Sequence, residues 1–207
     1  MTATPAVVTP PDHRFPWYVR ILFWMQKRRY GAVLESARLW ARTPKVFVAL
    51  AVLYAAFERR SSPIEPGLRT LLIVRVSQIN GCTFCVDLNS AVGLRRGVSM
   101  EKLMALPEFA GSALFTNREK VALRFAEAVT CPGVQRAAAH FEQLRRHFDD
   151  EAIIELTGLI AFQNLSSKFN AALGVAPQGF CPIAPGPPIT GPRTDPDQRK
   201  SIAVQSS

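Results

Sequence analysis

The residues of this chain best suited to chemistry are Cys82 and Cys85, which stand two residues apart directly after Asn80 and Gly81. In a helix this spacing places both sulfurs on one face. The unpaired amides and the dipole of a helix's first turn favour a thiolate there. We therefore expect a pair that can cycle between dithiol and disulfide.

Two neighbours of the pair can be placed by the same helical spacing. Asn89 follows Cys85 by four residues and shares its face, so it is the polar side chain nearest the sulfurs. Asp87 follows Cys85 by two residues, about 200 degrees around the helix, and is expected to point away as a solvated acid. No histidine stands near the pair in the sequence. The three histidines are His13, His140 and His147.

Two other interpretations of the pair remain open: a structural, chemically inert pair, and half of a metal site. Zinc would require two more ligands. The other cysteines, Cys131 and Cys181, each precede a proline and have no cysteine nearby in sequence, so we interpret them as small buried or loop thiols. We therefore expect no metal and no cofactor.

The elements that position these residues are expected to be helices. Apolar positions recur with helical periodicity and breaks occur at proline, glycine and serine. The run at residues 71–76 is rich in β-branched residues, yet the apolar stretch around it is long and favours a helix over a strand. The expected helices are 17–27, 32–41, 44–60, 67–79, one from the cysteine pair onward, a short one opened by Ser99 and ending before Pro107, one capped by Asn117, 134–148, and 149–173.

These segments predict one all-α domain with flexible ends. We expect a flexible N-terminus at residues 1–13, a helical domain at 14–175 and a proline-rich flexible tail at 176–207. The longest apolar run, at residues 46–57, is shorter than the roughly twenty residues that span a bilayer. Residues 1–11 lack the pattern of a secretory signal, so we expect a cytoplasmic protein with mostly reduced thiols.

The net charge of +9 is scattered along the chain as arginine pairs near expected helix ends. No nucleic-acid-reading motif accompanies the charge, so we expect no nucleic-acid partner. The segment WYVRILFWMQK, residues 17–27, carries apolar side chains around most of its circumference. It is expected to pack on the domain core or in a subunit interface, and attachment to a membrane surface is the less favoured alternative.

The segment RTLLIVRVSQINGCTFCVDLNSAVGLRRG, residues 69–97, resembles the carboxymuconolactone decarboxylase and alkylhydroperoxidase D-like family. A weaker likeness extends to RTPKVFVALAVLYAAF upstream and to NREKVALRFAEAV and ELTGLIAFQNLSSKFNAALGV downstream. The resemblance implies an all-helical fold, homo-oligomers, and thiol-dependent reduction of a peroxide with a dithiol electron donor. It implies Cys85 as the thiol that attacks the peroxide and Cys82 as the resolving thiol.

The chain departs from the family pattern at two positions. Active members have a glutamate twelve residues before the first cysteine and a histidine four residues after the second, where this chain has Thr70 and Asn89. Neither side chain titrates near neutral pH, so the acid–base help of the family is missing unless another group supplies it. Glu65 could approach the site from the loop before Thr70.

Three functions therefore remain open. They are a peroxidase that works without the usual relay, a dithiol protein that exchanges disulfides without reducing peroxide, and a helical oligomer without catalysis that binds a partner or a membrane surface. The lactone decarboxylation in the family name is disfavoured, because that chemistry does not need a CxxC pair and no lactone site is visible.

Overall fold

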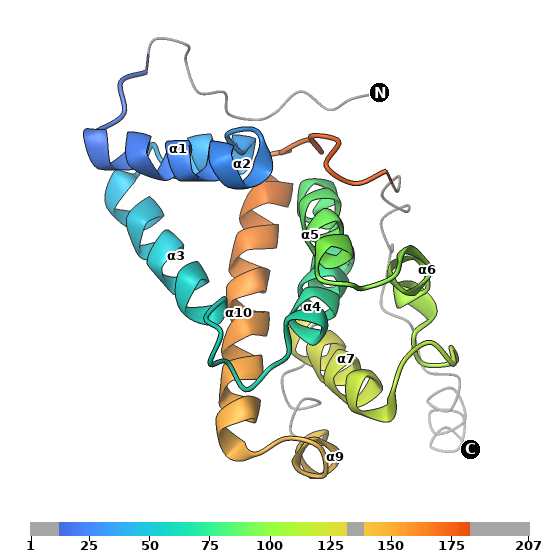
Figure 1. Cartoon of the computed structure of the whole chain (residues 1–207). Helices are drawn as coiled ribbons and strands as arrows, with labels where there is room; N and C mark the ends of the chain where they lie inside the picture. The colour runs from blue at the N-terminus through green and yellow to red at the C-terminus, as the bar shows by residue number, and fades with distance from the viewer. Residues whose placement is uncertain (1–12, 132–138, 183–207) are drawn as a thin grey trace, which may run out of the picture.

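The computed structural model describes residues 13–131 and 139–182, and this part of the chain is helical without a strand (Figure 1). The all-α fold expected from the sequence is confirmed. The elements are α1 (Trp17–Tyr30), α2 (Glu35–Trp40), α3 (Pro44–Phe57), α4 (Pro66–Ile79), α5 (Thr83–Arg95), α6 (Met100–Met104), the 3-10 turn η1 (Leu106–Glu108), α7 (Asn117–Thr130), α9 (Phe141–Arg145) and α10 (Asp150–Ala172).

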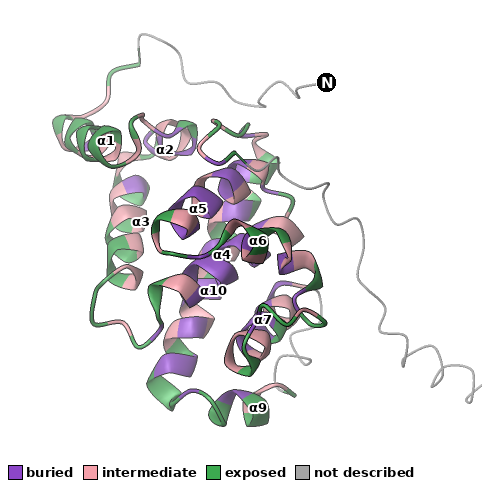
Figure 2. Ribbon diagram, turned by 45° about the vertical axis from the view of Figure 1, so that its right-hand side comes forward, coloured by how far each residue is buried: buried purple, intermediate pink, exposed green. Residues whose placement is uncertain are grey.

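The centre of the molecule is α4, which packs against α5, α7 and α10. Residues 68–77 of α4 are all buried, as the purple ribbon in Figure 2 shows. A helix that is covered on every side needs apolar residues around its whole circumference. This explains why the sequence of α4 shows neither the stripe of a surface helix nor the alternation of a half-buried strand.

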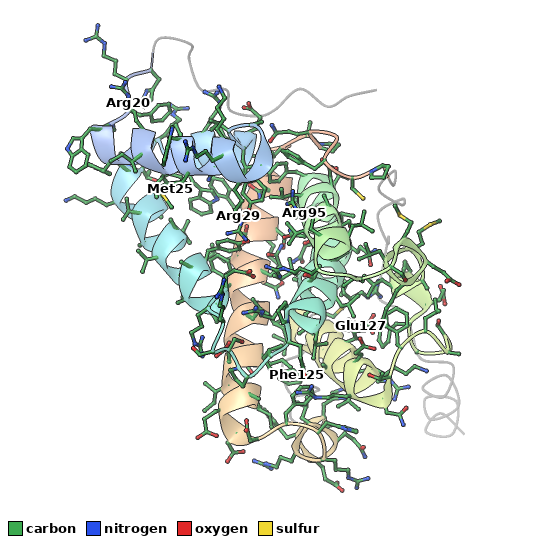
Figure 3. All side chains as sticks on the ribbon, in the orientation of Figure 1. Arg20, Met25, Arg29, Arg95, Phe125 and Glu127 are labelled. Carbon is green, nitrogen blue, oxygen red and sulfur yellow. A yellow bond between two sulfur atoms is a disulfide. The ribbon has the colours of Figure 1, made fainter. Side chains whose placement is uncertain are left out.

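Polar side chains on α4 are paired within this core. Arg75 is almost fully buried and forms an ion pair with Glu127, which lies on α7 (Figure 3). Ser77 accepts a hydrogen bond of 2.8 Å from the amide of Gln163 on α10. A buried polar group costs free energy unless it is paired, so these contacts fix how α7 and α10 lie against α4.

The N-terminal helices form a second layer. In Figure 1, α1 and α2 lie across one end of the bundle, and α3 descends beside α10. Their buried side chains join those around the cysteine pair in a hydrophobic cluster separate from the main core. Its buried members are Val19, Leu34, Ala37, Ala41, Phe47, Cys82, Phe84, Cys85 and Val175.

Several helix ends differ from the expected ones. Helix α7 is capped by Thr116 instead of Asn117, because Thr116 and Glu119 form a reciprocal capping box. Ser99 caps α6 as expected. The helix expected over residues 134–148 is present as the short α9, whose last residue is Arg145, and residues 132–138 lie outside the described part.

The segment after α10 lies against the domain. Backbone amides of Gln178 and Cys181 are held by α5, and the side chain of Gln178 accepts a hydrogen bond of 2.9 Å from the amide of Glu35 at the start of α2. The first residues of the expected tail at 176–207 are therefore packed. Residues 1–12 and 183–207, which hold most of the expected flexible extensions, lie outside the described residues.

Within residues 13–131 and 139–182, no helix combines the length and the apolar character needed to cross a membrane. The longest helix, α10, has 23 residues, and buried polar side chains such as Gln163 and Asn170 interrupt its apolar surface.

Candidate active site

The cysteine pair sits at the turn between α4 and α5. Gly81 in this turn has a φ of 66°, which an L side chain rarely adopts. The side-chain amide of Asn80 donates hydrogen bonds of 2.9 Å to Asn164 and 2.8 Å to Ser167, both on α10. The Asn-Gly sequence before the pair therefore makes the tight turn and ties it to the longest helix.

Cys82 and Cys85 are joined by a disulfide, with their Cα atoms 5.2 Å apart. Cys82 is the N-cap of α5, and its sulfur accepts a hydrogen bond of 3.2 Å from the backbone amide of Cys85. Both side chains are buried at about 2 % exposure. The described structure is thus the oxidised form of the pair, on a helix terminus that favours negative charge on sulfur.

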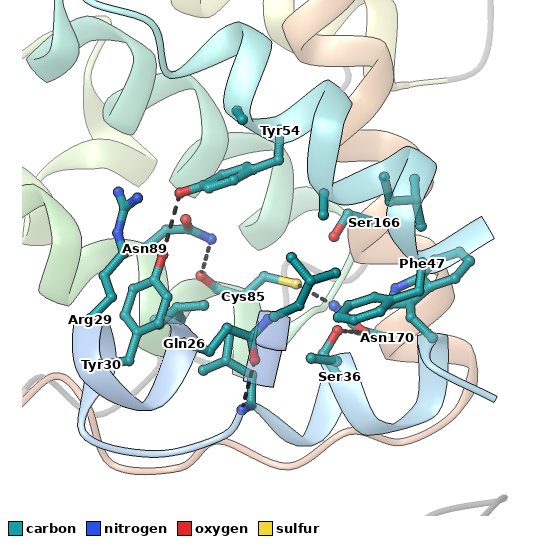
Figure 4. Close-up of a pocket in the computed structure, with 18 of the residues that line it drawn as sticks. Gln26, Arg29, Tyr30, Ser36, Phe47, Tyr54, Cys85, Asn89, Ser166 and Asn170 are labelled. Atoms are coloured by element: carbon teal, nitrogen blue, oxygen red, sulfur yellow. Dashed lines mark hydrogen bonds between the residues drawn. The ribbon is translucent and has the colours of Figure 1, made fainter. Parts of the chain in front are cut away.

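A cavity of about 620 Å³ opens beside the pair, between α1, α2, α3, α5 and α10 (Figure 4). Cys85 forms part of its wall, whereas Cys82 is not among the residues that line it. Most of the wall is apolar. The large apolar lining residues include Trp40, Phe47, Phe84, Leu88 and Phe162.

Asn170 of α10 contacts the sulfur of Cys85 and also lines the cavity. Its side-chain amide donates a hydrogen bond of 3.3 Å to Sγ of Cys85. Its carbonyl oxygen accepts a hydrogen bond of 2.7 Å from the hydroxyl of Ser36 on α2, which fixes the orientation of the amide. Asn170 is almost fully buried. Sequence reasoning missed this residue, and the available signal was a polar amide in an apolar helix far along the chain.

Asn89 lies beside the pair, where the helical spacing put it. Its amide nitrogen donates a hydrogen bond of 2.7 Å to the backbone oxygen of Cys85, and the residue also lines the cavity. This amide is therefore committed to the backbone of the CxxC turn. It supports the position of Cys85 and carries no titratable proton.

Thr70 is buried in α4 and is not among the residues that line the cavity. Its hydroxyl donates to the backbone oxygen of Pro66 at 3.0 Å and accepts from Arg96 at 3.1 Å. Arg96 also forms an ion pair with Glu58, a residue of the cavity wall. The position at which the family resemblance implies a glutamate thus holds a neutral hydroxyl beside an arginine.

Glu65, considered from the sequence as a group that could approach the pair, lies elsewhere. It forms an exposed ion pair with Arg118 and is not among the residues that line the cavity. The prediction that Glu65 could reach the site is therefore wrong, because α4 begins directly after Glu65 and directs this residue toward α7.

Two tyrosines stand in the cavity wall, and sequence reasoning missed both. The hydroxyl oxygens of Tyr30 and Tyr54 are 3.5 Å apart, and either can be the donor (Figure 4). The guanidinium of Arg29 lies 5.5 Å from the ring centre of Tyr30 and 6.0 Å from that of Tyr54. Burial, with Tyr30 and Glu58 nearby, raises the pKa of Tyr54 above its usual value.

Asp87 is a buried residue, so its interpretation as a solvated acid was wrong. It does point away from the cavity, but the segment after α10 covers it. Its two carboxylate oxygens accept hydrogen bonds of 2.8 Å from the amide of Gln178 and 2.7 Å from the amide of Cys181. The helix that carries the cysteine pair is thereby tied to this segment.

The remaining cysteines are separate from the pair. Cys131 follows α7 and is partly exposed, and Cys181 is buried beside Asp87. Among the described residues, no three histidine, cysteine, aspartate or glutamate side chains gather closely enough to hold a metal ion.

Comparisons with known proteins agree with this geometry. Residues 44–128 match the carboxymuconolactone decarboxylase family model. The uncharacterized protein YnjA of Escherichia coli is 40 % identical over 176 residues, which cover 84 % of this chain and 96 % of YnjA.

Two solved structures have the same fold. The alkylhydroperoxidase AhpD core protein of Ralstonia eutropha JMP134, described as peroxidase-related, aligns with a TM-score of 0.77 and 23 % identity over 89 % of this chain and 100 % of that one. A peroxidase-related protein of Silicibacter sp. TM1040 aligns with a TM-score of 0.76 and 22 % identity over 84 % and 92 %. On the match to the family model and the likeness to YnjA, the chain belongs to the carboxymuconolactone decarboxylase family, and it has the fold of the alkylhydroperoxidase AhpD core protein.

Proposed function

We propose that the protein reduces peroxides with the thiols of Cys82 and Cys85. The observation that carries this proposal is the disulfide between the two cysteines, with Cys85 in the wall of a cavity large enough for a small organic molecule. The position of Cys85 supports its role as the attacking thiol, and the position of Cys82 behind it supports its role as the resolving thiol.

The chemistry proceeds in three steps. The Cys85 thiolate attacks one oxygen of the peroxide, the O–O bond breaks, and the products are a sulfenic acid and an alkoxide that takes up a proton to become an alcohol. The Cys82 thiol then attacks the Cys85 sulfur, and the disulfide forms with loss of water. An external dithiol donor reduces the disulfide and is itself oxidised.

The cavity favours an organic hydroperoxide over hydrogen peroxide. Its volume of about 620 Å³ lies in the range of sites that enclose small organic ligands. Its aromatic walls, which include Trp40 and Phe162, provide apolar surface that hydrogen peroxide cannot use. A reducing compartment such as the cytosol would keep the donor dithiol available.

The test begins with reduced protein and an organic hydroperoxide such as cumene hydroperoxide. We expect the peroxide to be consumed with a dithiol donor, and mass spectrometry of the peptide that contains both cysteines to show disulfide formation. The Cys85→Ser variant should be inactive. The Cys82→Ser variant should stop at a sulfenic acid on Cys85. Thiols that stay reduced in excess peroxide would refute the proposal.

A disulfide exchange activity without peroxide reduction is the nearest alternative within the same site, and the same experiment separates the two. A protein that oxidises or reduces a dithiol substrate through the Cys82–Cys85 pair, but whose reduced form does not react with peroxide, would be a dithiol oxidoreductase.

A second candidate function rests on the exposed side of α1. Trp17 is 72 % exposed and Trp24 is 55 % exposed, and Arg20 lies between them in sequence. Tryptophan and arginine are enriched at the centres of protein interfaces. This surface supports self-association of the chain into the homo-oligomer that the family resemblance implies. Replacement of Trp17 and Trp24 by serine should then lower the molar mass that light scattering measures, because the oligomer dissociates. The Cys85→Ser variant should keep the molar mass of the parent protein.

A further inference from the structure

The proposed peroxide reduction needs a proton donor that the usual family positions do not supply. The alkoxide released when the O–O bond breaks must receive a proton. Thr70 lies outside the cavity wall, and the amide of Asn89 is bonded to the Cys85 backbone. The donor must therefore be another group that faces the cavity.

The described cavity wall contains few side chains that can give up a proton. Glu58 lines it, but its carboxylate is already engaged by the guanidinium of Arg96 in an ion pair. His13, His140 and His147 are not among the lining residues. Arginine does not release its proton in proteins. Hydroxyl groups remain, and the tyrosine phenols are the most acidic of these.

We propose that Tyr54 donates the proton to the leaving oxygen of the peroxide and that Tyr30 returns a proton to Tyr54. This inference rests on the proposed function. The two hydroxyl oxygens are 3.5 Å apart, and Figure 4 shows them directed at one another beside Asn89, the residue bonded to Cys85. Cys85, Tyr30 and Tyr54 line the same cavity, so a substrate that reaches Cys85 shares this cavity with the phenol of Tyr54.

The protons and electrons balance as follows. Cys85 enters as a thiolate, its sulfur bonds to one peroxide oxygen, and the electron pair of the O–O bond leaves on the other oxygen. That oxygen takes the phenolic proton of Tyr54, which gives an alcohol and a phenolate. The phenolate recovers a proton from Tyr30, and Tyr30 recovers one from water at the open side of the cavity.

Arg29 is placed to stabilise the transient phenolate of Tyr54. Its guanidinium lies within 6.0 Å of both tyrosine rings, on the lower face of α1 (Figure 3). A positive charge beside a phenol lowers the cost of the phenolate. Burial works in the opposite sense and keeps Tyr54 protonated before the reaction, which is the state a proton donor requires.

A comparison of two oxidants with different leaving groups separates proton donation by Tyr54 from an effect of the substitution on packing. An alkyl hydroperoxide releases a strongly basic alkoxide, which needs a proton, whereas a peracid releases a carboxylate, which does not. All variants are made in Cys82→Ser protein, so that a single oxidation of Cys85 is followed by stopped flow. The oxidants are tert-butyl hydroperoxide and peracetic acid.

We expect Tyr54→Phe to slow oxidation of Cys85 by tert-butyl hydroperoxide about 100-fold, the usual size of a lost general acid. Oxidation by peracetic acid should stay close to the rate of the parent protein. Tyr30→Phe should show the same selectivity with a smaller loss. The matched control is Tyr18→Phe, which removes the same atom from the tyrosine that does not line the cavity and should change neither rate.

Two outcomes would overturn the inference alone. In the first, Cys85 of the Tyr54→Phe variant is oxidised by the alkyl hydroperoxide at the parent rate. In the second, the variant is oxidised more slowly by both oxidants to the same extent, which would mean that Tyr54 only shapes the cavity. If the parent protein reacts with no peroxide, the proposed function fails and the inference fails with it. Thermal unfolding of each variant shows that a lost rate does not come from a lost fold.

Discussion

The side-chain amide of Asn170 donates a hydrogen bond of 3.3 Å to the sulfur of Cys85, across 85 residues of sequence. Ser36 fixes the other end of this amide. A hydrogen bond to a charged acceptor is stronger than one to a neutral acceptor, so in the reduced protein this contact would favour the thiolate of Cys85 over its thiol. The long helix α10 therefore contacts the sulfur of a cysteine on α5.

Loss of this hydrogen bond should make Cys85 less reactive. We expect Asn170→Ala to slow alkylation of the reduced Cys85 by iodoacetamide about tenfold at neutral pH, because about 1.4 kcal/mol of thiolate stabilisation is lost. Mass spectrometry of the Cys85 peptide measures the rate. The control is Lys168→Ala on the same helix, whose side chain is exposed. Equal rates for the two variants would contradict the prediction.

Asp87 should hold the segment after α10 in place. In Asp87→Ala both acceptors for the amides of Gln178 and Cys181 are lost, so hydrogen exchange at these two amides should become at least about tenfold faster. The free energy of unfolding should fall by about 2 kcal/mol. Asp150→Ala, in the exposed first turn of α10, serves as the control. Unchanged exchange at residue 181 would show that another contact holds the segment.

Close packing at Gly93 should forbid a larger residue. A Cβ atom there would stand 2.8 Å from Cγ2 of Thr70, so the Thr70 side chain or the backbone around it would have to shift. We expect Gly93→Ala to lower the free energy of unfolding by roughly 1–2 kcal/mol in urea denaturation, although alanine favours a helix. Gly111→Ala, with open space around the new atom, is the matched control.

A second substitution tests the cause at Gly93. Thr70→Ser removes the methyl group that the new Cβ would meet and keeps the hydroxyl that bonds Pro66 and Arg96. The double variant should recover part of the stability that Gly93→Ala loses. A strictly additive loss would mean that the methyl group of Thr70 does not cause the strain.

Tyr54 should make stability depend on pH in the alkaline range. Its pKa is raised in the folded protein above the usual value of about 10, so the folded state holds this proton more strongly than the unfolded state. Above that usual value the unfolded chain releases the proton and the folded chain keeps it. The free energy of unfolding should therefore decrease as the pH rises past about 10. Denaturation of wild type and Tyr54→Phe across this range measures the effect, and parallel curves would contradict it.

The sequence was sufficient for features that depend on local spacing. The all-α fold follows from the periodicity of the helices, and the place of Asn89 beside Cys85 follows from a separation of four residues on one helix. The family follows from the residues around the cysteine pair. The predicted N-cap of α7, Asn117, was one residue too late. Thr116 and Asn117 are both good capping residues, but only Thr116 has a glutamate three residues later, Glu119, which closes a capping box.

Features that depend on distant segments were not predictable in the same way. Helical geometry correctly turned Asp87 away from the cavity, but it carried no information about the segment near Cys181 that covers it. The contacts of Asn170 with Cys85 and of Tyr30 with Tyr54 join helices that are far apart in sequence. No periodicity within one helix predicts such a contact. The tyrosine hydroxyl groups in the cavity wall could therefore be identified only from the structure.

The cavity wall has a consequence for how this protein can change. The family match covers residues 44–128, which include the cysteine pair, whereas α1 and α2 precede that range. These two helices nevertheless provide Tyr30, Ser36 and Trp40 to the cavity. The cavity beside the cysteine pair is thus built in part from residues outside the range that holds the pair. Exchange of α1 and α2 between relatives would change part of the cavity wall and leave the cysteine pair unchanged.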